Sequence, residues 1–337
     1  MSETISRSEL RKIAAEWIAD GKSVAGPTRI KPDLVLYSTL GSIEDLVLDG
    51  FVRPANSIKE FVFPRQEKLY GYRIEGNTVE IVEDLQPPGE QVVIAARACD
   101  AAALPILDHV FNWDVADGFY NRRRQATTVI TLACLEHDDS CFCTSVGLSP
   151  VAESGSDVLL LELGPDNYEV RCLTEKGAAL FHGKTETSDR AGAADPGPAN
   201  RLDPQSVAEF AKSRFEDPFW ERHALTCMGC GACAFTCPTC HCFDIVDGGP
   251  AAGNSRVRTW DTCQFAIFTA HASGHNPRSD QASRQRQRML HKFSIYPEKF
   301  GEILCTGCGN CARNCPAGMG VLSVATEMDD EKTYQHI

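Results

Sequence analysis

Several features that define other protein classes are missing from this 337-residue sequence. It contains no run of about 18 or more apolar residues, so no segment is expected to cross a membrane on its own. Its N-terminus, Met1 to Thr4, lacks a charged and apolar leader, which predicts a cytoplasmic protein. Positive charge is scarce: the formal net charge is −13. This balance argues against general nucleic-acid binding, because phosphate contacts need a basic surface.

Familiar catalytic and nucleotide-binding motifs are absent as well. No G-x-G-x-x-G follows a predicted strand, and no P-loop occurs. No Ser-His-Asp or paired-carboxylate arrangement can be located either. The sequence therefore shows no dinucleotide site, although flavin sites often lack such a fingerprint.

Cysteine, by contrast, is abundant, with 16 residues. Two runs share one spacing, namely Cys227-x2-Cys230-x2-Cys233-x3-Cys237-Pro238 and Cys305-x2-Cys308-x2-Cys311-x3-Cys315-Pro316. This is the spacing of bacterial ferredoxins, in which thiolates hold [4Fe–4S] clusters and the fourth cysteine of a run binds the other cluster. Structural zinc sites use separated ligand pairs, and disulfides are disfavoured in a chain that is not secreted. We expect Cys227, Cys230, Cys233 and Cys315 to bind cluster 1, and Cys305, Cys308, Cys311 and Cys237 to bind cluster 2.

The length and the alternation of apolar patterns predict two domains. Residues 1–182 are expected to form an α/β domain with a partly parallel sheet. The expected strands are Leu34–Tyr37, Val92–Ala96, Thr128–Leu132 and Val158–Leu163, and the expected helices are Ser6–Ala19 and Ala101–Phe111. Residues 183–203, which are small, polar and rich in Gly and Pro, are predicted to be a linker or exposed loop. Residues 204–337 begin with a helix over Pro204–Phe215 and are expected to form a mainly α-helical two-cluster ferredoxin domain.

Four cysteines of the first domain predict a third metal site. Cys99 and Cys134 each follow a predicted strand, and Cys141 and Cys143 come shortly afterwards. If the two strands are parallel neighbours, both cysteines emerge at the same edge of the sheet, where sites form in α/β proteins. The quartet fits a third [4Fe–4S] cluster, with inert buried cysteines or a zinc site as the alternatives.

The remaining cysteines carry weaker predictions. Cys172 lies in an apparent strand and is expected to be a core residue. Cys240, Cys242 and Cys263 are predicted to shield the first cluster and shift its potential, or else to bind a further metal ion.

Basic and histidine residues also have open interpretations. The stretch of Arg278, Arg284, Arg286, Arg288, His291 and Lys292 is a solvated helix face, a docking surface for an acidic subunit, or a set of donors to the anionic clusters. Arg122–Arg124 is interpreted in the same way. His241 touches a cluster or donates a hydrogen bond, and His275 shapes a turn.

Seven segments together resemble one family of iron–sulfur proteins. The family comprises the beta subunits of cytoplasmic sulfhydrogenases, which are NAD(P)-linked nickel–iron hydrogenases, and the related iron–sulfur subunit of anaerobic sulfite reductase. The segments are Ile58–Pro64, Ala98–Leu104, Cys141–Cys143, Cys237–Phe243, Trp260–Phe265, Gly274–Asn276 and Cys305–Pro316. The resemblance covers nearly the whole chain and is weakest over Gly183–Asn200. It implies an electron-transfer subunit of a complex, and it supports Cys99, Cys134, Cys141 and Cys143 as cluster ligands.

Three functions follow as hypotheses. In the first, the chain relays electrons between a flavin-containing subunit that handles NAD(P)H and a catalytic hydrogenase or sulfite-reducing subunit, alongside small iron–sulfur subunits. In the second, it is a self-contained reductase with its own flavin or substrate site. The third, a free ferredoxin-like shuttle, is disfavoured because a carrier needs only the cluster module.

Overall fold

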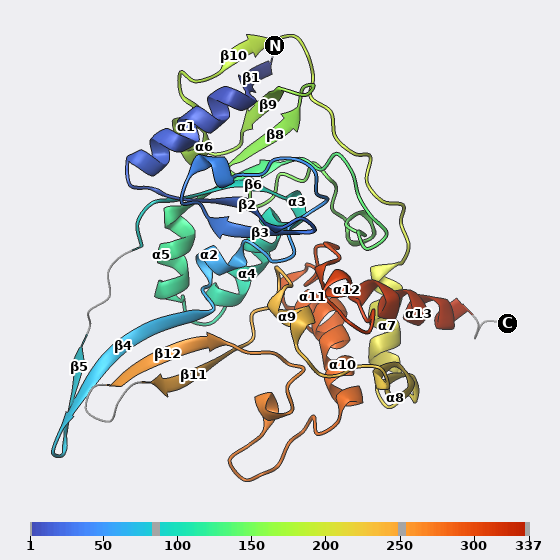
Figure 1. Cartoon of the computed structure of the whole chain (residues 1–337). Helices are drawn as coiled ribbons and strands as arrows, with labels where there is room; N and C mark the ends of the chain where they lie inside the picture. The colour runs from blue at the N-terminus through green and yellow to red at the C-terminus, as the bar shows by residue number, and fades with distance from the viewer. Residues whose placement is uncertain (1, 83–87, 249–253, 334–337) are drawn as a thin grey trace.

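The computed structural model describes residues 2–82, 88–248 and 254–333, and its largest feature is an eight-stranded mixed sheet (Figure 1). The strand order in this sheet is β10-β1-β9-β8-β7-β6-β2-β3. The strands are β1 (Ser2–Ser6), β2 (Ser23–Lys31), β3 (Leu34–Thr39), β6 (Gln91–Ala96), β7 (Thr127–Leu132), β8 (Val158–Glu162), β9 (Asn167–Cys172) and β10 (Glu186–Ser188).

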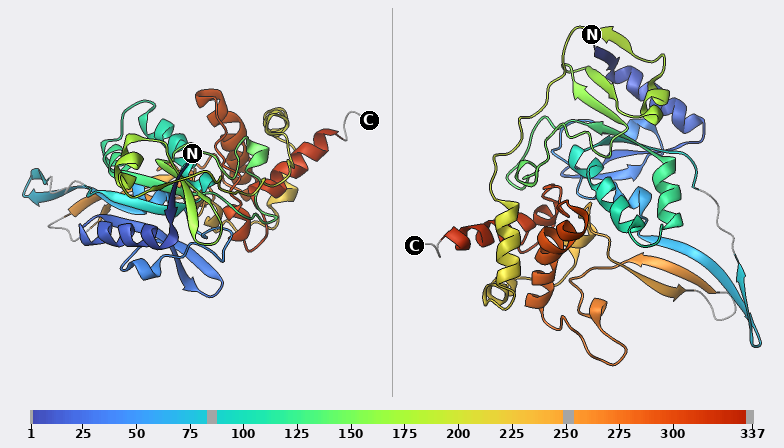
Figure 2. Two further views of the ribbon diagram at one scale, coloured as in Figure 1. Left: turned by 90° about the horizontal axis from the view of Figure 1, so that it is seen from above. Right: turned by 180° about the vertical axis from the view of Figure 1, so that it is seen from behind.

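The centre of this sheet is parallel, as predicted. β2 pairs with β6, β6 with β7 and β7 with β8 in parallel, whereas the outer pairs are antiparallel. The central strands are apolar on both faces because helices cover both: Val92 packs with α1 (Arg7–Ala19), and Val93 packs with α4 (Ala103–Asn112). Figure 2 shows these helices on opposite sides of the sheet. Cys172 packs at the edge of the α1 core and is only partly buried, close to its predicted role.

The helices of the first half agree with the sequence patterns, with one division. α1 begins after Ser6, whose hydroxyl accepts a hydrogen bond from the backbone N–H of Glu9 and so caps the helix. The helix expected over Ala101–Phe111 is preceded by a separate turn, α3 (Ala98–Ala101), which carries Cys99. α2 (Lys59–Val62), α5 (Gly118–Ala126) and α6 (Glu175–Phe181) complete this half, with short 3-10 turns at Ile43–Asp45 and Thr144–Val146.

A second sheet joins the two halves of the chain. It is antiparallel, has the order β11-β12-β4-β5, and projects from the body as an arm (Figure 1). Its strands are β4 (Gln66–Glu75), β5 (Thr78–Val82), β11 (Phe243–Gly248) and β12 (Asn254–Trp260). The expectation of a mainly helical second domain missed β11 and β12, in which β-branched residues such as Ile245 and Val257 favour strands. The predicted boundary between the domains is crossed here, because β12 pairs with β4.

The rest of the second half is helical and packs around its own core. Phe210, Trp220, Met289 and Val324 are among the residues of this core. The helices are α7 (Pro204–Ser213), α8 (Phe219–Ala224), α9 (Ala232–Phe235), α10 (Gln281–Leu290), α11 (Tyr296–Phe300), α12 (Asn310–Arg313) and α13 (Val321–Thr333). A 3-10 turn at Ala266–Thr269 and a π-helical turn at His291–Ile295 accompany them.

Residues 183–203 are more than a linker. Residues 186–188 form β10 and pair with β1, and Ala193 bridges to Glu162. Gly192 lies so close to Leu161 that an added Cβ would fall 2.5 Å from the Cβ of that residue. Small residues therefore let this segment run along the sheet, where polarity and lack of periodicity had suggested an exposed loop.

Within the ranges that the structure describes, no helix is long and apolar enough to cross a membrane.

Candidate metal centres

The first three cysteines of the first run and the last cysteine of the second run line one cavity. Its thiols are those of Cys227, Cys230, Cys233 and Cys315. Two amide groups of α10 point at the first of them: the Nε2 of Gln281 and that of Gln285 lie 3.2 and 2.9 Å from the Cys227 Sγ. Cys315, although distant in sequence, is thus brought to the first run, and we name this cavity site 1.

The first three cysteines of the second run line a second cavity, site 2, together with the last cysteine of the first run. Its thiols are those of Cys237, Cys305, Cys308 and Cys311, and all four residues are buried. Backbone N–H groups face these sulfurs: that of Gly307 lies 3.5 Å from Cys305 Sγ, and that of Val321 lies 3.3 Å from Cys311 Sγ. The two fourth cysteines are exchanged between the sites, as crossed ligation requires.

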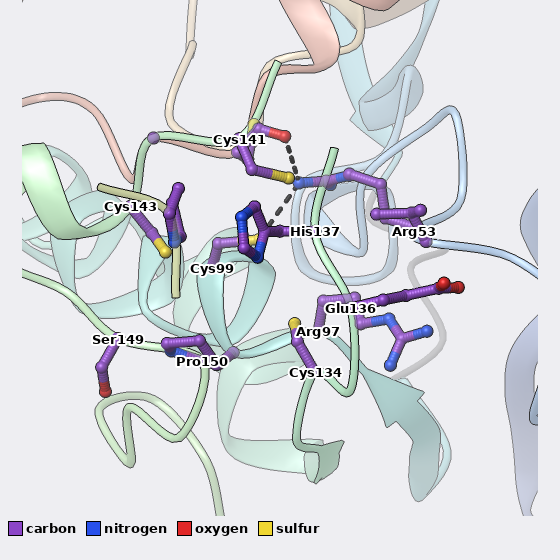
Figure 3. Close-up of a pocket in the computed structure, with 15 residues that line it drawn as sticks. Arg53, Arg97, Cys99, Cys134, Glu136, His137, Cys141, Cys143, Ser149 and Pro150 are labelled. Carbon is purple, nitrogen blue, oxygen red and sulfur yellow. Dashed lines mark hydrogen bonds between the residues drawn. The ribbon is translucent and has the colours of Figure 1, made fainter. Parts of the chain in front are cut away.

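Four cysteines of the first half, namely Cys99, Cys134, Cys141 and Cys143, line a third cavity, site 3 (Figure 3). Cys99 follows β6 and Cys134 follows β7; these strands are parallel neighbours, so both residues emerge at one edge of the sheet. Cys141 and Cys143 come from the loop after Cys134, and that loop lies on the second cysteine run: the Phe142 N–H donates to the Gly307 carbonyl at 2.9 Å. The quartet predicted from strand ends is therefore brought together.

Arginines that sequence reasoning missed point at the sulfurs of site 3. Arg53 Nη1 lies 3.1 Å from Cys99 Sγ and also donates to the Cys308 carbonyl (Figure 3). Arg313 Nη2 lies 3.0 Å from Cys141 Sγ. Arg53 is anchored by a buried ion pair with Asp100 at 2.8 Å. Arg53 precedes Cys99 by 46 residues, so no local pattern signals this contact.

Two further buried cations serve sites 1 and 2. Arg288 lines both cavities and is 4% exposed. The Nζ of Lys292 lies 3.5 Å from Cys237 Sγ and 2.9 Å from the Leu304 carbonyl. Burial lowers the pKa of Lys292, but the sulfurs of Cys237, Cys240 and Cys305 raise it well above its usual value. A solvated helix face, one interpretation of the basic stretch, is therefore wrong for Arg288 and Lys292.

The other members of the basic stretch lie farther from the sulfurs. Arg284 is buried and donates to the Arg278 carbonyl. Arg286 donates to the Phe215 carbonyl near the surface. Burial lowers the pKa of His291 to about 3, so this residue is neutral at pH 7.

The second basic patch forms ion pairs within the chain. Arg123 pairs with Glu67 at 2.8 Å, and Arg124 pairs with Asp108 at 3.2 Å. Arg122 lies over the ring of Phe119.

The three additional cysteines lie behind the sites. Cys240 lies next to Cys237, and Cys242 lies next to Cys263. These residues line none of the three cavities. His241 Nδ1 lies 3.0 Å from the Thr239 carbonyl, and burial lowers its pKa to about 4. His275 closes the predicted turn by accepting from the His271 N–H at 2.8 Å.

The donor set fits anionic metal–sulfur clusters. Burial raises the pKa of Cys305 and of Cys308 to about 12, so each thiol gives up its proton only to a strongly stabilising partner such as a metal. Arg288 Nη2 is buried and has no hydrogen-bond partner among the described residues, although it lines both cavities. Among all residues that the structure describes, no group of three or more His, Cys, Asp or Glu side chains is placed to hold a single metal ion.

The comparison with known families agrees with this donor set. Residues 226–319 match the 4Fe-4S dicluster domain, a range that contains both cysteine runs. This is an iron–sulfur protein. The match confirms the [4Fe–4S] cofactor for the second half, whereas a cluster at site 3 stays a prediction.

A curated relative extends the likeness of this iron–sulfur protein beyond the matched domain. The chain is 29% identical over 318 residues to sulfhydrogenase 2 subunit beta of Pyrococcus furiosus, covering 90% of this chain and 92% of the relative. The alignment is longer than the dicluster domain and extends into the first half. No solved structure matches the chain significantly.

Because each site takes its fourth cysteine from the other run, a substitution of that cysteine should affect the cluster of the other run. Replacement of Cys237 with Ser is expected to alter the electron paramagnetic resonance (EPR) signal of the cluster at site 2 and to leave that of site 1 unchanged, since this residue lines site 2 alone. Cys315→Ser is the matched control and should have the opposite effect. If each variant disturbed only the cluster of its own run, crossed ligation would be refuted.

Proposed function

We propose that this iron–sulfur protein is the electron-relay subunit of a cytoplasmic oxidoreductase complex. It would connect a flavin-containing subunit that handles NAD(P)H with a catalytic subunit of the hydrogenase type, or alternatively of the sulfite-reducing type, with small iron–sulfur subunits as further partners. The likeness to a sulfhydrogenase beta subunit supports the complex. The lining residues that neighbouring sites share are the observation that carries the relay.

Shared lining residues support one order for the sites. Arg288 lines sites 1 and 2, and Cys308 lines sites 2 and 3. Among the residues that the structure describes, none lines both site 1 and site 3. Site 2 is therefore the middle position of a row, and the route runs from site 1 through site 2 to site 3 or in the reverse direction.

Exposure differs along this row in the way a relay needs. All four cysteines of site 2 are buried, at 7–9% exposure. Site 1 reaches the surface at Cys230, and its neighbour Met228 is 67% exposed. We infer that a partner protein docks at site 1, because exchange with another protein needs an exposed end.

The buried cations prepare the sites for negative charge. A [4Fe–4S] cluster, when bound, accepts and donates single electrons at a potential set by charge, burial and hydrogen bonds to its sulfurs. Arg53, Arg288 and Lys292 place fixed positive charge beside the cysteines. Positive charge near the sulfurs favours the more negative, reduced state, so these residues would raise the potentials.

Metal content and magnetic coupling together test the proposal. The chain purified anaerobically should hold roughly 12 iron and 12 sulfide, four of each per cluster. In the fully reduced state, EPR relaxation should show site 2 coupled to both of its neighbours, with signals assigned through Cys237→Ser and Cys315→Ser. Stronger direct coupling between sites 1 and 3 would overturn the order. Tightly bound stoichiometric flavin that survives gel filtration would favour a self-contained reductase instead.

A further inference from the structure

A separate cavity of about 500 Å³ lies next to site 3. It opens at the carboxyl ends of the parallel strands, where α/β folds bind ligands. Leu132 ends β7, Glu162 ends β8, and Arg97 follows β6; all three line the cavity. Its volume is about that of cavities that hold small molecules. Neither cluster binding nor the relay uses this space.

The floor of this cavity holds polar groups without partners. Tyr168 is 2% exposed and Arg97 is 5% exposed. Within the described ranges, neither the Tyr168 hydroxyl nor the Arg97 Nε has a hydrogen-bond partner within 3.5 Å, and the same is true of the Arg7 Nε. Burial raises the pKa of Tyr168 more than the neighbouring Arg7 guanidinium lowers it, so the hydroxyl keeps its proton and can donate to a ligand. Buried donors in native proteins are nearly always paired, so a ligand with acceptor atoms would complete this floor.

Charge and shape narrow the class of ligand. The rim carries the exposed carboxylates of Glu136 and Asp166, which disfavour a strongly anionic ligand, whereas Asp49 forms an ion pair with Arg7. Part of the wall is apolar, with Leu48, Leu132 and the ring of Phe51, over which the guanidinium of Arg97 lies at 4.9 Å. An uncharged ring with carbonyl acceptors satisfies both regions, because its oxygens would face the donors and its flat surface the apolar wall.

We propose that this cavity binds an uncharged carbonyl-bearing ring of the flavin or quinone kind. Tyr168 and Arg97 donate to the carbonyl oxygens of the ring. The ring binds reversibly, unlike a permanently held cofactor. Its binding does not depend on the direction of electron flow.

Position links the cavity to the end of the row of sites. Arg97 and Glu136 line both this cavity and site 3, and both are seen beside Cys134 in Figure 3. A ring held here would lie next to the last site of the relay. A flavin and a quinone both carry carbonyl oxygens that accept hydrogen bonds. Only the flavin also has an N–H group, which could donate a hydrogen bond to the carboxylate of Glu162 at the end of β8.

Equilibrium dialysis of the anaerobically purified chain tests this proposal, with riboflavin and menadione as probes. Saturable binding of at least one probe is expected, at one ring per chain. Tyr168→Phe should weaken it about tenfold, the loss expected for one hydrogen bond. Tyr72→Phe, on the projecting arm in β4, is the control and should bind normally. Riboflavin monophosphate should bind more weakly than riboflavin, and Glu136→Gln combined with Asp166→Asn should reduce that difference.

The outcomes distinguish a flavin from a quinone, and they test ring binding separately from the electron-relay proposal. Binding of riboflavin alone assigns a flavin, and binding of menadione alone assigns a quinone. Absence of saturable binding by both probes would overturn the inference, as would equal affinity of wild type and Tyr168→Phe. Neither result would change the iron content or magnetic coupling, so the relay proposal would stand or fall separately.

Discussion

Replacement of Arg288 with Leu is expected to remove iron from two sites at once. Arg288 lines sites 1 and 2, and one of its N–H groups has no other partner in the described part of the chain. Without it, the thiolates and clusters on both sides would lose a buried positive charge. Removing one partner of a buried charge pair costs about 3–5 kcal/mol. We expect the iron content to fall from roughly 12 toward roughly 4 per chain, since only site 3 is untouched.

Iron and sulfide analysis after anaerobic purification measures this effect, and two variants control it. Arg288→Lys keeps the charge and should retain much of the iron. Arg286→Leu lies two residues away on α10, where the arginine reaches Glu216 at the surface, and should change stability by no more than about 1 kcal/mol. Equal loss of iron in the Leu variants at positions 286 and 288 would show that the helix, rather than the buried charge, supports the sites.

Gly307→Ala is expected to separate site 2 from site 3. The backbone of Gly307 is left-handed, with φ of +62°, and an added Cβ would fall 2.5 Å from the backbone N and Cα of Cys143. An alanine in this conformation costs about 1–2 kcal/mol, and the overlap adds about 1–3 kcal/mol. Relief of the overlap would push the loop with Cys141 and Cys143 away from the second run. Iron should therefore fall from roughly 12 to roughly 8 per chain.

The control for this prediction has the same backbone strain without the contact. Gly274 has φ of +83°, and an added Cβ there meets no atom within 4 Å. Gly274→Ala should lose only the strain energy and keep its iron, which chemical denaturation and metal analysis would show. If Gly307→Ala kept three clusters at full stability, the close packing of this loop would be irrelevant to site 3.

Spacing along the sequence grouped the cysteines into the same quartets that line the three sites. The two runs are local motifs, and Cys99 and Cys134 could be paired because each follows a strand of a parallel sheet. The surroundings of the sulfurs were not predictable in this way. Arg53 and Lys59 are single basic residues with no periodic context, and their buried positions depend on contacts with the second half, such as that between Lys59 Nζ and the Cys240 carbonyl at 2.8 Å.

Strand pairing across the chain was similarly hidden. β4 alone carries a weak signal, and its partner β12 lies in a segment expected to be helical. Which segments become neighbours is decided by tertiary packing, and a single sequence does not encode that in a local pattern. The same reason explains why residues 183–203 were expected to be a linker, because β10 is a strand only through its pairing with β1.

The pairing of β4 with β12 also has a consequence for synthesis of the protein. Tyr72 leaves the ribosome long before its partner Asn254, so one edge of β4 in the nascent β4–β5 hairpin is still unpaired. An open strand edge invites pairing with other chains. The first half thus remains prone to aggregation until the segment between the two cysteine runs has been made. Truncation before residue 254 should leave this edge permanently uncovered, so the two halves are expected to fold poorly as separate fragments.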